Sequence, residues 1–270
     1  MAIWFAKKIW ICRGVDFVMR IGVIGTGIMA SYMVMAFCDY ECEHEFILSP
    51  RNKEKAAYLA NKYVNVSVAK DNQEVLDNCE VVILSVLPQK AEEILKPLQF
   101  RKDHKVISVI AILGLRRIAE LVGETEILVD VLPLPFISQR IGPLVINPPC
   151  EEMEELLRPL GDLVILESAE EMNVIRAITA LMSPFYELCY SIVDWSEKNG
   201  LNEPAAKAYT TSFFNALSIM ASQTAEGKLK ELAEEMTPGG LNWQAVTYLQ
   251  EKETFTKWQE ALDGILRRIS

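Results

Sequence analysis

The residues best suited to chemistry in this chain are Gly25, Gly27 and Ala30, which directly follow the apolar segment 21–24. An apolar run over residues 29–37 comes next, so the spacing falls between a predicted strand and a predicted helix. Gly25 permits a tight turn, Gly27 lets the backbone approach a pyrophosphate, and the small Ala30 lets helix and strand pack closely. The amides that open the helix would bind phosphates. This context predicts a dinucleotide site, which also includes Thr26, Ile28 and Met29; the alternative is a tight turn that binds no ligand.

The end of the second predicted strand distinguishes NAD from NADP, because a carboxylate there binds the ribose 2′-hydroxyl. Here the chain reads Ser49-Pro50-Arg51-Asn52-Lys53, and Glu45 stands at the wrong end of the strand. Hydroxyl, guanidinium and ammonium groups suit a 2′-phosphate through charge-assisted hydrogen bonds. We therefore expect NADP, with NAD as second choice; the alternative is that Arg51 and Lys53 are ordinary solvated residues.

Composition excludes several classes of function. The 270 residues carry 27 basic and 37 acidic side chains, a net charge of −10, which argues against nucleic-acid and anionic-membrane partners. The two histidines, His44 and His104, lie in polar stretches, which disfavours a Ser-His-Asp or metal–histidine mechanism, and no metal site is expected. The six cysteines form no C-x-x-C pair, so reduced thiols and a cytoplasmic location are expected. No apolar run reaches the length of a membrane span.

Alternating patterns predict an α/β fold, an N-terminal Rossmann-type doubly wound sheet in residues 19–167. Strands are expected at 21–24, 45–49, 64–68, 80–86, 105–111, 126–131, 144–147 and 163–166, and helices at 29–37, 53–62, 72–78, 89–98, 116–122 and 151–160. Residues 1–18 mix Lys7, Lys8 and Arg13 with apolar residues, which indicates an extension outside the fold; the alternative is an amphipathic segment that touches a membrane.

Residues 168–270 carry no strand signal and are predicted to form an all-helical domain. Apolar residues recur at helical spacing through 175–195, and Pro184 is expected to kink that helix. The stretch 203–221 is apolar nearly all round, so it must be buried on several sides. About a hundred residues cannot bury both helices alone, and we therefore predict a homodimer, or a higher homo-oligomer, formed through the helices of this dimerisation domain.

In this order, the motifs resemble those of the pyrroline-5-carboxylate reductase family over residues 19–270. The matching stretches are Gly25–Ala30, Ser49–Asn52, Asn72–Glu74, Val86–Gln89, Ile107–Ala111 and Thr237–Asn242. The resemblance implies a cofactor site that also includes Asn72, Val86, Leu87, Pro88 and Ala111. It further implies hydride transfer from NADPH to a small cyclic imine acid, giving proline.

The departures from the family pattern fall where the substrate is expected. Leu87 replaces a lysine, the segment 132–135 lacks an asparagine, and the stretch 179–186 is two residues shorter and without its glycines. Leu241 and Asn242 stand where the family has threonines. The resemblance therefore supports the reaction class better than the substrate.

A Pro-Gly-Gly turn that opens a helix suits a carboxylate, for the reason that phosphates bind helix starts. We expect Gly239, Gly240 and Leu241 to bind substrate through this turn, and Thr237 and Asn242 to act as catalytic side chains. Ser183 is a further catalytic candidate. The alternatives are that Thr237 caps the following helix and that Ser183 satisfies backbone groups at a kink.

Three other functions remain open at this point. A reductase of a different small imine or keto acid would keep the same cofactor half. A β-hydroxyacid dehydrogenase would need a lysine on the first long helix, whereas residues 168–195 contain only Arg176 as a basic residue. A nucleotide-binding paralogue without catalysis, acting as a sensor or partner, would explain the altered pocket motifs.

Overall fold

The computed structural model describes residues 18–40 and 43–270, so the predicted extension lies, apart from Val18, outside the described residues. The chain divides into two compact units, the first ending at Met172 and the second beginning at Asn173. This division falls inside helix α7 (Ala169–Thr179), a few residues after the predicted boundary at 167.

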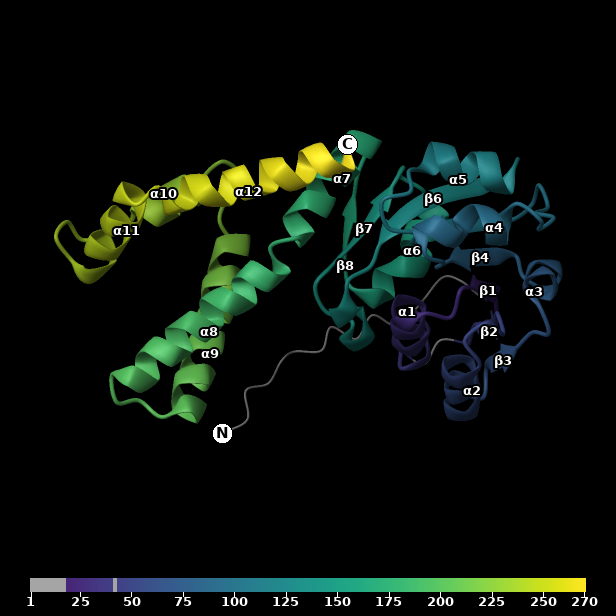
Figure 1. Cartoon of the computed structure of the whole chain (residues 1–270), viewed down its shortest axis with the longest axis horizontal. Helices are drawn as coiled ribbons and strands as arrows, with labels where there is room; N and C mark the ends of the chain where they lie inside the picture. Colours follow the sequence, from purple (N-terminus) through teal and green to yellow (C-terminus); the bar gives the residue numbers. More distant parts are fainter. Residues whose placement is uncertain (1–17, 41–42) are drawn as a thin grey trace. The chain divides into compact units, whose positions relative to one another are not determined.

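The first unit is built on an eight-stranded sheet of order β3-β2-β1-β4-β5-β6-β7-β8 (Figure 1). All neighbouring strands are parallel except β6 and β7, which are antiparallel. The strands are β1 (Arg20–Ile24), β2 (Glu45–Leu48), β3 (Val66–Val68), β4 (Val81–Leu84), β5 (Lys105–Ser108), β6 (Ile127–Leu132), β7 (Pro143–Asn147) and β8 (Asp162–Ile165). The predicted Rossmann-type doubly wound sheet is confirmed, and its reversal of strand order lies between β1 and β4.

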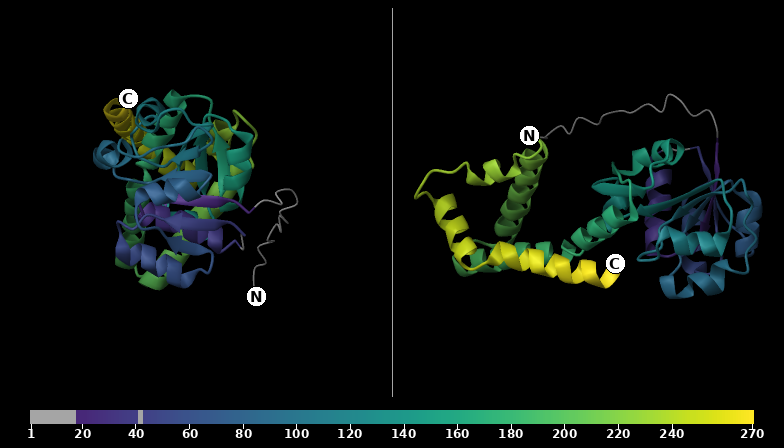
Figure 2. Two further views of the ribbon diagram at one scale, coloured as in Figure 1. Left: turned by 90° about the vertical axis from the view of Figure 1, so that its right-hand side faces the viewer. Right: turned by 90° about the horizontal axis from the view of Figure 1, so that it is seen from above.

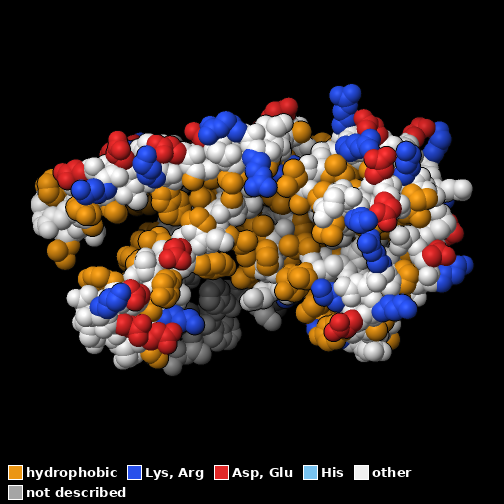
Figure 3. Space-filling model, viewed as in Figure 1, with side chains coloured by type: hydrophobic (Ala, Val, Ile, Leu, Met, Phe, Trp, Pro, Cys, Tyr) orange, Lys and Arg blue, Asp and Glu red, His pale blue; other side chains and the backbone are white. Residues whose placement is uncertain are grey.

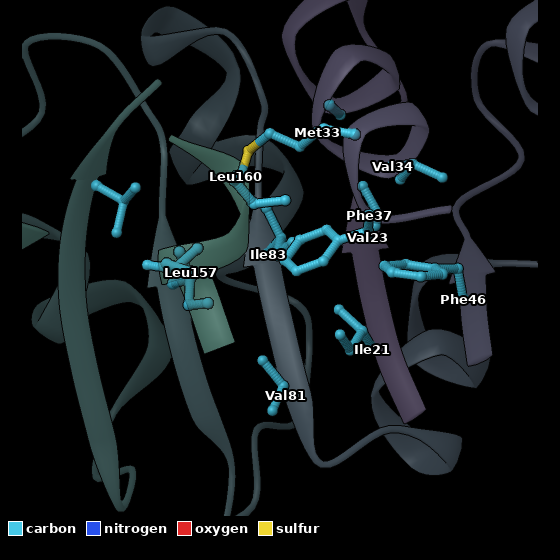
Figure 4. Close-up of a cluster of buried hydrophobic side chains, with 14 of the residues drawn as sticks. Ile21, Val23, Met33, Val34, Phe37, Phe46, Val81, Ile83, Leu157 and Leu160 are labelled. Carbon is cyan, nitrogen blue, oxygen red and sulfur yellow. The ribbon is translucent and has the colours of Figure 1, made fainter. Parts of the chain in front are cut away.

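Helices cover both faces of this sheet (Figure 2). One hydrophobic cluster unites alternate strand residues with α1 (Ile28–Cys38), α2 (Lys53–Lys62) and α6 (Glu151–Leu157). The other cluster packs α3 (Asn72–Asn78), α4 (Ala91–Leu95) and α5 (Leu115–Val122) on the opposite face. In the first cluster the rings of Phe37 and Phe46 lie 5.5 Å apart between α1 and β2 (Figure 4). The central strands β1, β4 and β5 are buried on both faces, which explains their near-continuous apolar sequences, whereas the edge strands β3 and β8 are largely exposed.

Several predicted boundaries were wrong. The strands predicted at 80–86 and 105–111 end at Leu84 and Ser108, because the following apolar residues leave the sheet and form loops. The strand predicted from residue 64 begins at Val66, after a turn in which Val64 is fully exposed. The helix predicted at 89–98 is a 3₁₀ turn followed by the short α4, which ends before Pro97.

The second unit is helical, as predicted, with α8 (Met182–Lys198), α9 (Glu203–Ser222), α10 (Leu229–Glu234), α11 (Leu241–Glu251) and α12 (Thr254–Ile269). Helices α8 and α9 pack against each other, with the rings of Phe185 and Phe214 5.9 Å apart. The expected kink at Pro184 is a break instead: α7 ends at Thr179 and α8 begins at Met182. Pro184 thus occupies the first turn of α8, where its missing N–H breaks no hydrogen bond.

Very little of the second unit is buried within the single chain. Helices α8, α10, α11 and α12 contain no buried residue, and α9 buries only Ala206 and Thr210. Hydrophobic side chains accordingly lie on its exposed surface (Figure 3). The expectation that 203–221 is buried on several sides is therefore not met by one chain, because among the described residues α8 is the one helix that packs closely along α9.

Candidate dinucleotide site

The turn between β1 and α1 is fixed by Gly25. Its φ is +97°, and a Cβ there would lie 2.4 Å from the carbonyl oxygen of Ser85. The Gly25 N–H donates to Ser49 Oγ at 2.9 Å, and Thr26 Oγ1 donates to the Ser49 carbonyl at 3.0 Å. Any side chain at residue 25 would therefore push the turn away from Ser85, the residue that directly follows β4.

Gly27 provides the opening that a phosphate needs. A Cβ at Gly27 would meet no atom within 4 Å, and Gly27 caps α1 without any side-chain hydrogen bond. The first-turn amides of α1, with the positive end of the helix dipole, therefore face this space. Ala30 is buried beneath the turn, while Ile28 is exposed and Met29 half-buried. This cradle fits the pyrophosphate of a dinucleotide.

The residues that follow β2 play two different parts: Ser49 is structural, whereas Arg51 and Lys53 are exposed charges. Ser49 is completely buried, and its hydroxyl is engaged with the glycine turn, so it shapes the turn rather than meeting a ligand. Asn52 caps α2 by accepting the Lys55 N–H at 3.2 Å. Arg51 and Lys53 are exposed on either side of this cap. The groups that can meet a 2′-phosphate here are therefore a guanidinium and an ammonium, without the hydroxyl we had expected.

The remaining predicted cofactor residues follow β3, β4 and β5. Asn72 is half-buried as the first residue of α3, whose cap is Asp71. Val86 is buried beside the glycine turn, Leu87 is exposed, and Pro88 opens a 3₁₀ turn. Ala111 is exposed after β5. Because these strands and β1 and β2 are all parallel, the structure brings every predicted cofactor residue to one edge of the sheet.

Our sequence analysis did not predict a role for Ile112, which follows β5 at the same edge. Its φ is +67°, in the left-handed region that β-branched residues strongly disfavour. It occupies the third position of a turn closed by the Leu113 N–H and the Ile110 carbonyl at 3.4 Å, where glycine is usual. A glycine at this position would have signalled the turn.

In the second unit the segment from Thr237 to Gly240 forms a tight turn. The Gly240 N–H donates to the Thr237 carbonyl at 2.9 Å, and Gly239 has a φ of +75°, as in a type II turn with Pro238 before it. Gly240, not Thr237, is the N-cap of α11, so the alternative of a Thr237 cap is wrong. No side chain caps this helix start, where Leu241 and Asn242 are both exposed.

Ser183 lies on a separate helix from this turn, as the second residue of α8, and is exposed. Its predicted role at a kink fails, because the chain breaks before Met182 and no kinked turn needs its hydroxyl. A catalytic role for Ser183 remains a prediction.

Neither histidine belongs to the dinucleotide site. Burial lowers the pKa of both His44 and His104. His104 Nδ1 accepts the Arg101 N–H at 3.0 Å, and its Nε2 lies 3.0 Å from the Leu76 carbonyl, at the amino end of β5. Among residues 18–40 and 43–270, no cluster of ligands could hold a metal ion and no helix is long and apolar enough to span a membrane. The cytoplasmic location stays a prediction.

Among known proteins, the similarity of a family model is confined to the part of the chain that contains the candidate dinucleotide site. Residues 20–112 match the family model described as NADP oxidoreductase coenzyme F420-dependent. Pyrroline-5-carboxylate reductase of Aquifex aeolicus is 27% identical over 254 residues, covering 87% of this chain and 90% of its own length.

Solved structures extend the similarity in fold to both units. The 1-pyrroline-5-carboxylate reductase of Streptococcus pyogenes aligns with a TM-score of 0.80 at 21% identity, over 93% of this chain and 98% of that one. A pyrroline carboxylate reductase of Plasmodium falciparum with NADP bound aligns with a TM-score of 0.78 at 17% identity, over 93% and 97%. Together with the motifs at the sheet edge, these findings show that the chain is similar to pyrroline-5-carboxylate reductases over most of its length, in sequence and in fold.

Proposed function

We propose that this protein is an NADP-dependent reductase that transfers hydride to the C=N bond of a small cyclic imine acid, with pyrroline-5-carboxylate as the first substrate to test. The observation that carries the proposal is the glycine turn. Gly25 has no room for a side chain, whereas Gly27 opens onto free space at the start of α1. NADPH, when bound, supplies the hydride.

The preference for NADP rests on charge. Arg51 and Lys53 are exposed at the start of α2, and no carboxylate ends β2. The hydrogen bond from Lys90 lowers the pKa of Glu93 on α4, and the Arg51 charge adds to this effect, so the guanidinium faces the element that follows β4. A 2′-phosphate between these elements would gain charge-assisted hydrogen bonds, each worth about 1.5–3 kcal/mol.

Substrate binding is assigned to the turn at 237–242. The uncapped amides that open α11 suit a carboxylate, and the Asn242 amide and the Thr237 hydroxyl can donate hydrogen bonds to it or to the imine nitrogen. The imine nitrogen must gain a proton as its carbon gains hydride. Thr237, Asn242 and Ser183 are the side chains we propose for positioning that nitrogen.

We further propose that the protein is a homodimer formed through the second unit. Phe213, Leu217 and Met220 are about half exposed on α9, and the exposed apolar surface continues onto α8, α11 and α12. Between α8 and α9 lies an apolar hollow of about 640 Å³, lined by Phe185, Phe214 and Leu217 among others. Monomeric proteins rarely expose apolar patches of this extent. A second copy presents equally apolar helices, which would cover them.

The experiment is an initial-rate assay with 1-pyrroline-5-carboxylate and either NADPH or NADH. We expect turnover with both and a higher kcat/KM with NADPH. Gly240→Val should abolish turnover and keep NADPH affinity within about twofold. A Cβ at Gly240 would press on the Thr237 carbonyl at 3.0 Å, while the cofactor cradle belongs to the other unit.

Asn242→Ala separates two roles of the amide. It should raise KM if the amide only binds substrate, and lower kcat if the amide assists protonation in the transition state. Tight NADPH binding without reduction of any imine would favour the paralogue that acts as a sensor or partner. Loss of catalysis would then be explained by Leu87 and Leu241, which replace a lysine and a threonine of the family pattern in this chain.

A further inference from the structure

The loops at the reacting edge of the sheet are unusually free of charge. Segments 85–89, 109–115 and 133–139, which follow β4, β5 and β6, contain no Asp, Glu, Lys, Arg or His. Two of their large apolar side chains are nevertheless open to solvent: Leu87 is 63% exposed and Ile112 is 61% exposed. Elsewhere in this unit, side chains of this size are mostly inside the two hydrophobic clusters.

The register of the sheet puts the two loops that carry these side chains next to each other along the edge. Leu84 of β4 pairs with Ser108 of β5, and the Val109 N–H extends the ladder to the Leu84 carbonyl at 2.9 Å. Leu87 and Ile112 follow the paired residues at nearly the same interval. Both therefore stand beyond the carboxyl ends of adjacent parallel strands, and β4, the nearer of the two, is the neighbour of β1 with its glycine turn.

Ile112 is exposed in a backbone conformation that its residue type disfavours. A φ of +67° suits glycine or asparagine, yet the chain places a β-branched apolar side chain there. Strained residues held in place by their surroundings gather at binding sites. An exposed hydrocarbon group held in a disfavoured conformation at a cofactor edge thus points to a contact with a ligand.

We propose that Leu87 and Ile112 form an apolar wall beside the nicotinamide end of the cofactor, and that this wall is specificity-determining. It admits the hydrocarbon face of a small imine ring and excludes polar substituents on the ring carbons. The proposal rests on the proposed function for its substrate, while its contact with the nicotinamide is tested by binding alone.

The first experiment measures the fluorescence of NADPH bound to the wild-type protein and to Ile112→Asn. Asparagine tolerates the left-handed conformation, so the variant should fold with an unchanged melting temperature. We expect blue-shifted emission in the wild type and a smaller shift in Ile112→Asn and Leu87→Ser. Adenosine 2′,5′-bisphosphate, which lacks nicotinamide, should bind all of them within twofold. Val64→Asn, at a fully exposed residue of the α2–β3 turn, is the matched control.

The second experiment compares kcat/KM for 1-pyrroline-5-carboxylate and for its analogue with a hydroxyl on a ring carbon. A hydrophobic site rejects an added hydroxyl by up to about 100-fold. We expect a preference of about 10- to 100-fold in the wild type and less than about threefold in Ile112→Asn.

These outcomes distinguish the two proposals. Identical emission in the wild type and in both wall variants would overturn the wall, and so would an unchanged preference between the two rings. Bound NADPH with altered emission but no turnover of either imine would refute the proposed reaction and leave the wall standing. No binding of NADPH would refute both.

Discussion

The two units of this protein use apolar residues in opposite ways. In the first unit, Ile21, Phe46 and Ile83 are completely buried, and two hydrophobic clusters cover the two faces of the sheet. In the second unit, Phe213, Trp195 and Tyr209 are each about half exposed or more, and of α8–α12 only α9 has buried residues. The first unit thus buries its large apolar side chains within one chain, whereas the second leaves many of them exposed, which is the basis of the proposed dimer.

The difference teaches that an apolar sequence does not by itself show that its side chains are covered by the same chain. The same reasoning applies on a small scale to the sheet edge, where apolar residues after β4 and β5 were mistaken for strand. In both places, hydrocarbon that the single chain leaves exposed is the ground on which we propose a binding surface.

The largest effect is expected from breaking the proposed dimer. Phe213→Asp combined with Leu217→Asp places two charges on the exposed face of α9. Each should cost about 2–4 kcal/mol of association energy, so the dimer dissociation constant should rise by more than about 1,000-fold. Sedimentation velocity at micromolar concentration measures this. Tyr58→Asp on the exposed surface of α2 is the control and should change nothing; a wild-type protein that sediments as a stable monomer would contradict the dimer.

The next effect contrasts the two glycines of the first unit. Gly25→Ala should destabilise the fold by about 2–4 kcal/mol, because it combines a disfavoured φ with a Cβ 2.4 Å from the Ser85 carbonyl. Gly27→Ala should leave stability nearly unchanged and weaken NADPH binding, since its Cβ points into open space. Urea unfolding and NADPH titration of both variants separate the two effects. Equal losses of stability would show that the open cradle at Gly27 is misassigned.

A smaller effect is expected from the charge that selects the nucleotide. Arg51→Ala should narrow the preference for NADPH over NADH about tenfold or more, through loss of a charge-assisted hydrogen bond. Lys62→Ala, at the far end of α2, should leave the preference unchanged. Isothermal titration with both nucleotides provides the measurement. Equal affinities of the wild type for both would contradict the preference itself.

The smallest effect concerns His104. Burial lowers its pKa in the folded state, so the unfolded chain binds the proton more readily, and this contribution to stability is lost as pH falls below about 6.5. A proton on His104 Nδ1 would face the Arg101 backbone N–H, whose hydrogen bond Nδ1 now accepts. The charged side chains near His104 are those of Arg101 and Asp103. Between pH 7 and pH 5 the loss should be at most about 2 kcal/mol. Urea midpoints at both pH values measure it, and His104→Gln should flatten the dependence; an unchanged slope would exclude this histidine.

Much of the fold followed from local pattern. The strand alternation, the helices α2 and α3 with their predicted limits at 53–62 and 72–78, and the helical second unit were all predicted and are confirmed. Strand ends were less predictable, because the sequences beyond Leu84 and Ser108 are as apolar as the strands themselves. Only the end of the hydrogen-bonded ladder distinguishes a strand residue from a loop residue there.

The amino-acid sequence by itself determined the cofactor half of this protein. A strand, two glycines and a small residue at fixed spacing allow very few conformations, so residues 20–30 carry their own geometry. Tertiary structure alone decided the role of Ser49, whose hydroxyl oxygen accepts the Gly25 N–H between the ends of neighbouring strands. It placed the loops carrying Leu87 and Ile112 at the same edge. It also decided that α9 stays exposed in one chain. These outcomes depend on which segments meet in space, and pairing between distant segments leaves no local pattern to read.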